Sequence, residues 1–148
     1  MFDVRRAIHI DSTAWLRMRE ALWPDEEVAA DVELYFAGTL EMPLEVLVAV
    51  DGFGQLIGFA ELSIRRYAEG CLTNRVAYLE GWYVEPQHRR HGVGGALVAA
   101  AEAWARTQGC TEFASDALLD NDVSASAHSA LGFEEVERIR CFKKSLTA

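Results

Sequence analysis

A glycine-rich turn between a predicted strand and a predicted helix constrains the fold most. The turn spans residues 84–97 and reads VEPQHRRHGVGGAL. A helix N-terminus presents unpaired N–H groups and a partial positive charge, so it is suited to bind phosphate. Gly92 and Gly94 lack Cβ atoms and let the backbone approach a pyrophosphate closely, and Arg89 and Arg90 offer charge-assisted donors. An ordinary strand-to-helix turn, with glycines only for packing, is the alternative.

Two other phosphate-binding motifs fit this turn less well. A P-loop needs Gly-Lys-Ser/Thr, and the turn contains no lysine. The dinucleotide fingerprint needs a third glycine where Leu97 stands.

Hydrophobic periodicity and turn residues predict an α/β fold with a mixed sheet. Helices are expected from Asp11 or Ser12, either of which can cap, to Leu22, and then over 25–37, 92–107 and 123–131. Strands are expected over 2–8, 44–50, 55–65, 75–84, 111–114 and 135–143. This order places helices on both faces of the sheet, and residues 75–114 should form a right-handed parallel crossover. The length of 148 residues predicts one domain, 1–148.

Composition narrows the possible partners. The chain has 23 acidic and 14 basic residues, a net charge of −9, which argues against nucleic acid because that partner requires neutralisation of phosphates. The charge suits a cationic small molecule, although taken alone it favours the simpler explanation that acidic residues keep the protein in solution. No apolar run approaches the roughly 20 residues of a membrane span, and no signal segment opens the chain. Cys71, Cys110 and Cys141 lack metal-ligand spacing, so we expect reduced thiols, no metal site and a cytoplasmic protein.

The turn also carries a family resemblance. Arg89-x-x-Gly92-x-Gly94 matches the Arg/Gln-x-x-Gly-x-Gly/Ala signature of GNAT acetyltransferases, and the preceding Val-x-Pro and following Leu97 match as well. The resemblance covers essentially the whole chain. It implies acetyl-CoA as cosubstrate and a mostly antiparallel sheet with a splayed parallel strand pair.

In that family the pantetheine lies along the strand before the turn and pairs with its backbone. The resemblance therefore implies a set of residues that contact the cofactor. These are Trp82, Val84, Arg89, Arg90, His91, Gly92, Val93, Gly94, Gly95 and Asn121.

Two carboxylates are candidates for binding a substrate ammonium group or accepting its proton. Glu80 stands in an otherwise apolar strand, where a carboxylate is costly unless paired or functional. Its structural alternative is a salt bridge to Arg65 or Arg75. Asp116 follows the next strand and lies near the same opening if the two strands are parallel neighbours, but it can equally serve as a turn or helix cap.

Further details resemble aminoglycoside 6′-N-acetyltransferases in particular. The matching segments are residues 22–24, 58–61, 70–71, 79–81, 114–116 and 128–133. In those enzymes the Leu-Glu-Gly glutamate and the Ser-Asp aspartate contact the drug's amines. The implied substrate-binding residues are Trp23, Tyr67, Glu80, Ser115 and Asp116, with the acidic second helix at the rim. Trp23 could instead pack at a helix end, and the acidic helix could be a solvated face.

One position departs from the family pattern. Many GNAT enzymes place a tyrosine four residues before Gly132, where this chain has His128. Histidine can donate a proton near neutral pH, so His128 joins Glu80 and Asp116 as a candidate catalytic residue. A backbone-bonded bystander is the alternative, with water as the acid.

The resulting hypothesis is direct acetyl transfer from acetyl-CoA to the 6′-amine of an aminoglycoside in a ternary complex. The alternatives are a GNAT enzyme for another amine, such as a polyamine or protein N-terminus, and a non-catalytic acyl-CoA-binding module. The resemblance alone suggests a homodimer.

Overall fold

The computed structural model describes residues 1–147, which form two compact units, Met1–Asp116 and the segment from Ala117 onward. The first unit contains a single five-stranded sheet in the order β1-β2-β3-β4-β5. Its strands are β1 (Phe2–Arg6), β2 (Glu45–Asp51), β3 (Leu56–Arg65), β4 (Val76–Val84) and β5 (Phe113–Ser115).

The sheet is antiparallel except at one edge. β1 pairs with β2, β2 with β3 and β3 with β4 in antiparallel register, whereas β4 and β5 run parallel. Helix α3 (Val93–Thr107) connects these two strands, as the predicted crossover requires. The expected mixed sheet with one parallel pair is therefore confirmed.

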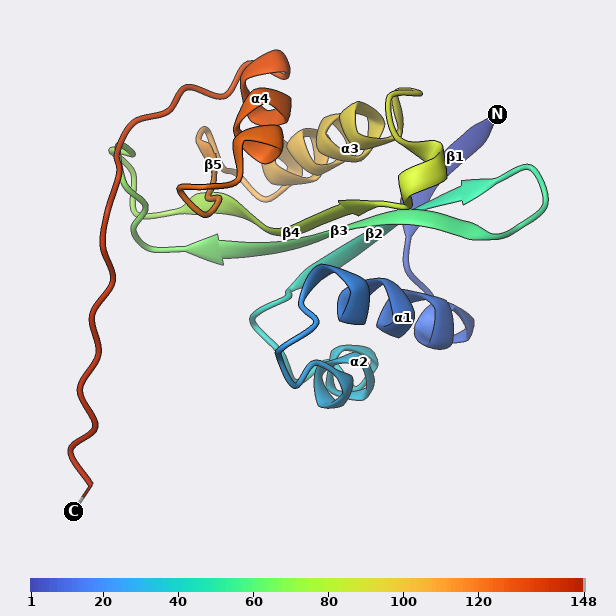
Figure 1. The fold of residues 1–148 in the computed structure, drawn as a ribbon, viewed down its shortest axis with the longest axis horizontal. Coiled ribbons are helices and arrows are strands. Elements are labelled where there is room, and N and C mark those ends of the chain that lie inside the picture. The colour runs from blue at the N-terminus through green and yellow to red at the C-terminus, as the bar shows by residue number, and fades with distance from the viewer. Residues whose placement is uncertain (148) are drawn as a thin grey trace. The chain divides into compact units, whose positions relative to one another are not determined.

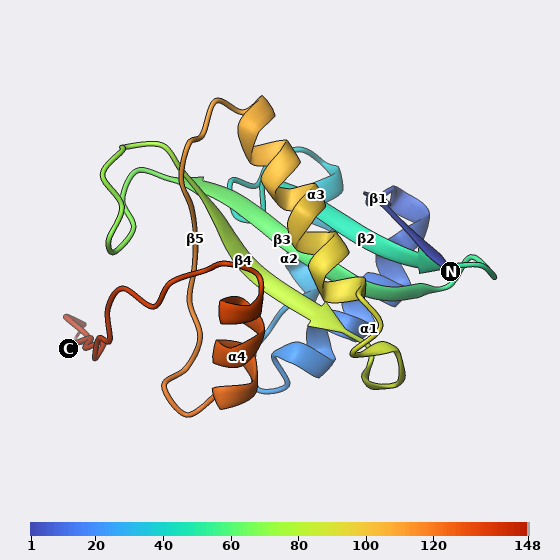
Figure 2. The same cartoon turned by 90° about the horizontal axis from the view of Figure 1, so that it is seen from above.

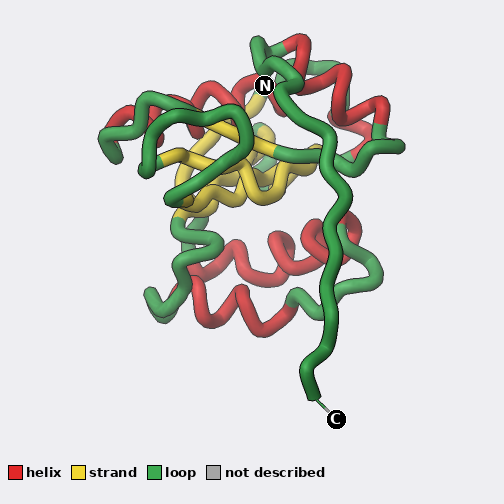
Figure 3. The backbone as a smooth tube through the Cα atoms, turned by 90° about the vertical axis from the view of Figure 1, so that its left-hand side faces the viewer, coloured by secondary structure: helices red, strands yellow, loops and turns green. Residues whose placement is uncertain are grey.

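Helices cover both faces of the sheet in this unit, as predicted. Helices α1 (Ser12–Leu22) and α2 (Ala29–Phe36) lie on one face and α3 on the other (Figure 1). Viewed from above, α3 crosses the strands obliquely (Figure 2), and the edge-on view shows the strands as the middle layer (Figure 3). Two short 3₁₀ helices, η1 (His9–Asp11) and η2 (Pro86–His88), stand before α1 and before α3.

The main core lies between the sheet and the α1–α2 pair. Trp15 and Met18 of α1 are fully buried at the helical spacing that the sequence predicts, and they pack with Val32, Val48 and Phe59. Strands β2 and β3 are buried on both faces, which explains their nearly continuous apolar sequence.

Two local details of the helices differ from expectation. Asp11 stands at the N-cap of α1, one of the two predicted positions, but its carboxylate makes no hydrogen bond to the helix and accepts from Arg5 and from the Ile8 N–H instead. The second helix begins at Ala29 rather than Asp25, because Pro24 and the following residues form a turn in which the Glu26 N–H donates to the Trp23 carbonyl.

The second unit contains α4 (Asp122–Ala130), followed by a turn at Gly132 with a positive φ of 92°. The predicted last strand, residues 135–143, is wrong for this chain: residues 133–147 form no helix or strand. A strand needs a neighbour for its backbone hydrogen bonds, and no strand pairs with this segment within residues 1–147.

Candidate active site

The parallel strands β4 and β5 separate partway along β4. They pair only from Ala77 opposite Phe113 to Leu79 opposite Ser115, and β4 then continues to Val84 beyond the end of β5. This is the splayed pair that the family resemblance implied. Ligands in sheets with parallel strands bind beyond such carboxyl ends, so we expect reactive side chains at the opening past Leu79.

A β-bulge places Glu80 at this opening. In the β3–β4 register Glu61 lies opposite Gly81 and Leu62 lies opposite Leu79, so Glu80 is the extra residue. Bulges redirect side chains and are common beside active sites. The bulge turns Glu80 toward Ser63 of β3.

The carboxylate of Glu80 is already paired. Arg65 donates through Nη2 to Oε1 at 2.7 Å and through Nε to Oε2 at 2.9 Å, and the Ser63 hydroxyl also donates to Oε2. Of the two predicted partners, Arg65 is therefore the actual one; Arg75 donates to the Gln108 carbonyl instead. The Glu80 side chain is 11% exposed and that of Arg65 is 34% exposed, so the pair lies at the surface of the opening.

Asp116 reaches the same cluster through Tyr78. The Tyr78 hydroxyl donates to Asp116 Oδ2 at 2.6 Å, and the guanidinium of Arg65 lies 3.6 Å from the centre of the Tyr78 ring. Burial raises the pKa of Tyr78, and the hydrogen bond to Asp116 raises it further, so the phenol remains a neutral donor. The hydrogen bonds to Glu80 raise the pKa of Arg65. We call Ser63, Arg65, Tyr78, Glu80 and Asp116 the acceptor cluster.

Trp23 lies against the strand that carries the cluster. A Cβ at Gly81 would come within 2.6 Å of the Trp23 ring, so only glycine permits this contact. The Trp23 ring also meets Phe59 edge-on, and the guanidinium of Arg19 lies 5.2 Å from its centre. Trp23 is thus both a packing residue and a neighbour of Glu80 in space.

A buried ion pair holds the segment that contains Trp23. Arg19 donates to both carboxylate oxygens of Glu61, at 2.7 and 3.0 Å, and to the Val28 carbonyl at 2.6 Å. Trp15 Nε1 donates to the same carboxylate at 2.9 Å. Since Arg19 precedes Trp23 and Val28 follows it, these bonds fix the loop between α1 and α2.

The remaining predicted substrate residues lie at different positions. Ser115 is in β5, and its hydroxyl donates to the Leu79 carbonyl at 3.4 Å, where the two strands part. Tyr67 lies just after β3, two residues beyond Arg65, and is 68% exposed.

The glycine-rich turn has the geometry expected of a phosphate site. Gly92 immediately precedes α3 with a φ of 86°, and no side chain caps the first turn of the helix. Arg90 also has a positive φ, 65°, which is uncommon for a residue with a side chain and is often found at functional sites. Arg90 and His91 are exposed, whereas Val93 is buried and anchors the helix.

Two side chains tie this turn to the end of β4. Trp82 Nε1 donates to the Gly94 carbonyl at 3.2 Å, and a Cβ on Gly94 would lie 3.2 Å from the Trp82 ring. Arg89 Nε donates to the Val84 carbonyl at 2.7 Å. Arg89 therefore ties the turn to the backbone of Val84, a residue whose main chain we expect along the pantetheine.

His128 and Asn121 belong to the second unit. Asn121 caps α4, because its side-chain oxygen accepts from the Ser124 N–H at 3.0 Å. His128 Nδ1 lies 2.7 Å from the Ser124 carbonyl, and its ring meets Phe133 edge-on. A carbonyl oxygen can only accept, so Nδ1 carries a proton in this contact.

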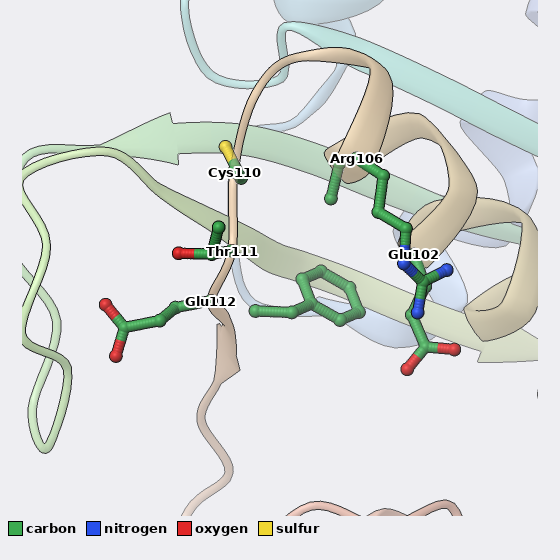
Figure 4. A pocket seen from close by; sticks show the side chains of 7 residues that line it. Glu102, Arg106, Cys110, Thr111 and Glu112 are labelled. Carbon is green, nitrogen blue, oxygen red and sulfur yellow. The ribbon is translucent and has the colours of Figure 1, made fainter.

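A pocket of about 430 Å³ lies elsewhere, between the C-terminal part of α3 and the chain before β5 (Figure 4). Its lining includes Glu102, Arg106 and Glu112. The carboxylate of Glu112 already accepts hydrogen bonds from the N–H groups of Leu72 and Thr73 and from the Thr73 hydroxyl. This pocket is at the wrong end of α3 for a phosphate, because helix C-termini attract cations.

The described residues contain neither a grouped set of metal ligands nor a membrane-spanning helix. Within residues 1–147 no three His, Cys, Asp or Glu side chains are grouped as metal ligands would be. No helix in that range has the length and apolarity that a membrane span requires.

The sequence analysis did not single out Ser63 or Tyr78. Tyr78 stands two residues before Glu80 in a strand, so the alternation of side chains placed it on the same face and was a usable signal. Ser63 carried no such signal, since its contact depends on the bulge and on the register of β3 against β4.

Comparisons with known proteins agree with this geometry. The model of the "Acetyltransferase (GNAT) family" matches residues 11–133. An aminoglycoside N(6′)-acetyltransferase type 1 of Klebsiella aerogenes is 54% identical over 146 residues, covering 97% of this chain and 96% of the relative. The crystal structure of aminoglycoside antibiotic 6′-N-acetyltransferase AAC(6′)-Ih from Acinetobacter baumannii is similar, with a TM-score of 0.89, 38% identity and coverage of 99% and 100%.

A further solved structure is AAC(6′)-Iy in complex with the bisubstrate analog CoA-S-monomethyl-acetylneamine, with a TM-score of 0.89, 36% identity and coverage of 98% and 99%. The matched residues include the glycine-rich turn and both strands of the splayed pair. The chain therefore belongs to the acetyltransferase (GNAT) family.

Proposed function

We propose that this chain transfers the acetyl group of acetyl-CoA to the 6′-amine of aminoglycoside antibiotics, and so confers resistance to them. The observation that carries the proposal is the placement of Glu80 and Asp116 in one cluster where β4 leaves β5, linked through Arg65 and Tyr78. Two carboxylates beside the strand along which the family binds its thioester suit a substrate with several ammonium groups. The aminoglycoside N(6′)-acetyltransferase that is 54% identical to this chain supports the same substrate class.

The cofactor's phosphates would be held by the turn before α3. The N–H groups of Val93, Gly94 and Gly95 begin that helix, Gly92 adopts the positive φ that admits them, and Arg90 and His91 lie exposed beside them. We assign Trp82 and Val84 to the strand edge along the pantetheine, and Arg89 to support of the turn. Acetyl-CoA supplies the acetyl group as a thioester.

Glu80 and Asp116 would bind the drug's ammonium groups, with Trp23, Tyr67 and Ser115 around them. Glu80 receives the proton of the reacting ammonium, through a water molecule. The free amine then attacks the acetyl carbonyl and the C–S bond of the adduct breaks. The new amide nitrogen releases its second proton to solvent and the thiolate leaves. No covalent enzyme intermediate is required.

For the departing thiolate we propose His128 as proton donor through Nε2, with Nδ1 held by the Ser124 carbonyl. Asn121, which we expected to contact the cofactor, supports this helix as its cap. A thiol with a pKa of about 8.5 is a modest base, so the loss of its acid should lower kcat by only about tenfold or less. Steady-state kinetics of His128→Gln tests the assignment. We expect this lower kcat together with an unchanged KM for acetyl-CoA.

The function is tested by steady-state assays with kanamycin, spermidine and a peptide with a free N-terminus. The proposal expects turnover of kanamycin and none of a matched aminoglycoside with a 6′-hydroxyl in place of the amine. Preferred turnover of spermidine or the peptide would point to another amine acetyltransferase. Binding of acetyl-CoA with no turnover of any amine would identify a binding module.

We also propose that residues 1–148 act as one acetyltransferase domain, in the cytoplasm, as a homodimer. The segment 133–147 supports the dimer, since it carries exposed apolar residues and has no strand partner in the described chain. Sedimentation at micromolar concentration should give twice the mass of the chain, and a monomer would contradict the proposal.

A further inference from the structure

The acceptor cluster contains a cation where the substrate is itself cationic. Arg65 is part of the site that should bind an ammonium, and it remains charged because the hydrogen bonds to Glu80 raise its pKa. On charge alone Arg65 should weaken the binding of a polycation. Its geometry indicates a different role.

Arg65 joins the two carboxylates of the cluster. Its guanidinium bonds both oxygens of Glu80, and the same group lies 3.6 Å from the ring centre of Tyr78, whose hydroxyl bonds Asp116. Glu80 lies in a bulge of β4 and Asp116 follows β5, so each stands one residue beyond Leu79 and Ser115, where the pairing of the two strands ends. Beyond that pairing, Arg65 and Tyr78 link the two carboxylates.

We propose that Arg65 is a positioning residue for the acceptor site. It holds the Glu80 carboxylate in one orientation and, through the Tyr78 ring, keeps the Glu80 and Asp116 carboxylates in register for two amines of one substrate. This inference rests on the proposed function and deepens it. The planar fork of arginine is required, because lysine supplies a point charge that can neither bond both oxygens nor stack on the ring in the same way.

Positioning and charge predict opposite effects. Glu80 uses one lone pair on Oε1 and two on Oε2 for Arg65 and Ser63, and a carboxylate offers about four such sites. One position therefore stays open for the substrate, and its direction depends on Arg65. Removing Arg65 frees the carboxylate to rotate, so KM for the drug should rise, whereas simple loss of a repelling charge should lower it.

The experiment compares Arg65→Lys, Arg65→Gln and the matched control Arg66→Gln. Arg66 is exposed and adjacent, and it forms none of the contacts of the cluster. We expect both Arg65 variants to raise KM for kanamycin about tenfold or more and to lower kcat, with KM for acetyl-CoA unchanged. Arg66→Gln should behave as the unmodified protein does.

The double variant Arg65→Gln/Glu80→Gln tests whether Arg65 acts through Glu80. Effects in one network are not additive, so Arg65→Gln should add little once Glu80 is neutral. Unchanged melting temperatures and acetyl-CoA affinities would show that the variants fold.

Three outcomes overturn the inference: full rescue by Arg65→Lys, a lower KM for Arg65→Gln, or full additivity in the double variant. The unmodified protein provides the separate test of function. If it does not acetylate kanamycin, the proposed function fails; if it does and Arg65→Lys is unaffected, only the positioning role fails.

Discussion

The cofactor turn and the acceptor cluster are built in different ways. The turn is one continuous segment, residues 84–97, and the groups that we assign to the cofactor's phosphates are backbone N–H groups at the start of α3. The acceptor cluster gathers side chains from β3, β4 and the residue after β5, at positions 63, 65, 78, 80 and 116. Backbone groups depend on conformation, whereas a side-chain cluster depends on each partner being present. The two regions should therefore fail differently when residues are replaced.

The largest effect should come from Gly92→Asp in the turn. A residue with a Cβ in the left-handed region costs about 1–2 kcal/mol of folding free energy. Separately, the new carboxylate repels a pyrophosphate and obstructs its close approach to the backbone. We expect acetyl-CoA affinity to fall about 100-fold or more, which corresponds to about 3 kcal/mol of binding free energy. Calorimetric titration with acetyl-CoA measures it.

Gly54→Asp is the matched control. Gly54 has a φ of 83°, and open space surrounds a Cβ built on it, as at Gly92, but it lies in the β2–β3 hairpin. It should carry the same backbone strain without affecting cofactor binding. Equal acetyl-CoA affinity for Gly92→Asp and the unmodified protein would place the phosphates elsewhere.

In the acceptor cluster the largest effect should come from Glu80→Gln. The change keeps the shape of the side chain and removes the proton acceptor, so kcat should fall by roughly 100-fold, within the range for general base catalysis. Steady-state kinetics with kanamycin separates kcat from KM. Glu102→Gln, the same change of charge on α3, serves as control.

An effect of Glu80→Gln on KM alone would assign Glu80 to binding only. Deprotonation of the amine would then belong to water or to the drug's own ionisation. The turn and the acceptor cluster would then both act mainly by binding, the one acetyl-CoA and the other the drug, and would differ only in the groups that they use.

Asp116→Asn should have a smaller effect, mostly on KM. A charge-assisted hydrogen bond contributes roughly 1.5–3 kcal/mol, so loss of its lower value raises KM about tenfold. Asp116 follows β5 and reaches an amine without lying on the thioester strand. A fall in kcat with constant KM would show that Asp116 acts in the transition state instead.

Tyr78→Phe should have the smallest effect of the series. It removes the hydroxyl that donates to Asp116 and keeps the ring on which Arg65 stacks. One hydrogen bond of about 1 kcal/mol corresponds to a KM increase of roughly fivefold. The same assay checks it, and no change in KM would mean that Asp116 is held without Tyr78.

The cofactor turn was predictable because its determinants are local. A few neighbouring residues set its backbone conformation: Arg89, Gly92 and the apolar helix that follows. In the structure Gly92 has a positive φ where the helix begins. The strand and helix order through residue 131 followed from periodicity for the same reason.

The acceptor cluster was only partly predictable. Glu80 was conspicuous as a carboxylate in an apolar strand, and Arg65 was one of its two candidate partners. Glu61 stands in an equally apolar strand yet forms a buried pair with Arg19, so the same signal marks a residue of the core. Only the contacts distinguish the two carboxylates.

The sequence by itself determined the class of the fold, the place of the glycine-rich turn and the family resemblance, because each depends on short-range pattern and backbone conformation. The tertiary structure decided which residues meet. The bulge that turns Glu80 toward Ser63, the stacking of Arg65 on Tyr78 and the reach of Tyr78 to Asp116 all depend on strand register. The failure of the predicted strand at 135–143 has the same cause: an alternating segment becomes a strand only when a neighbour accepts its hydrogen bonds.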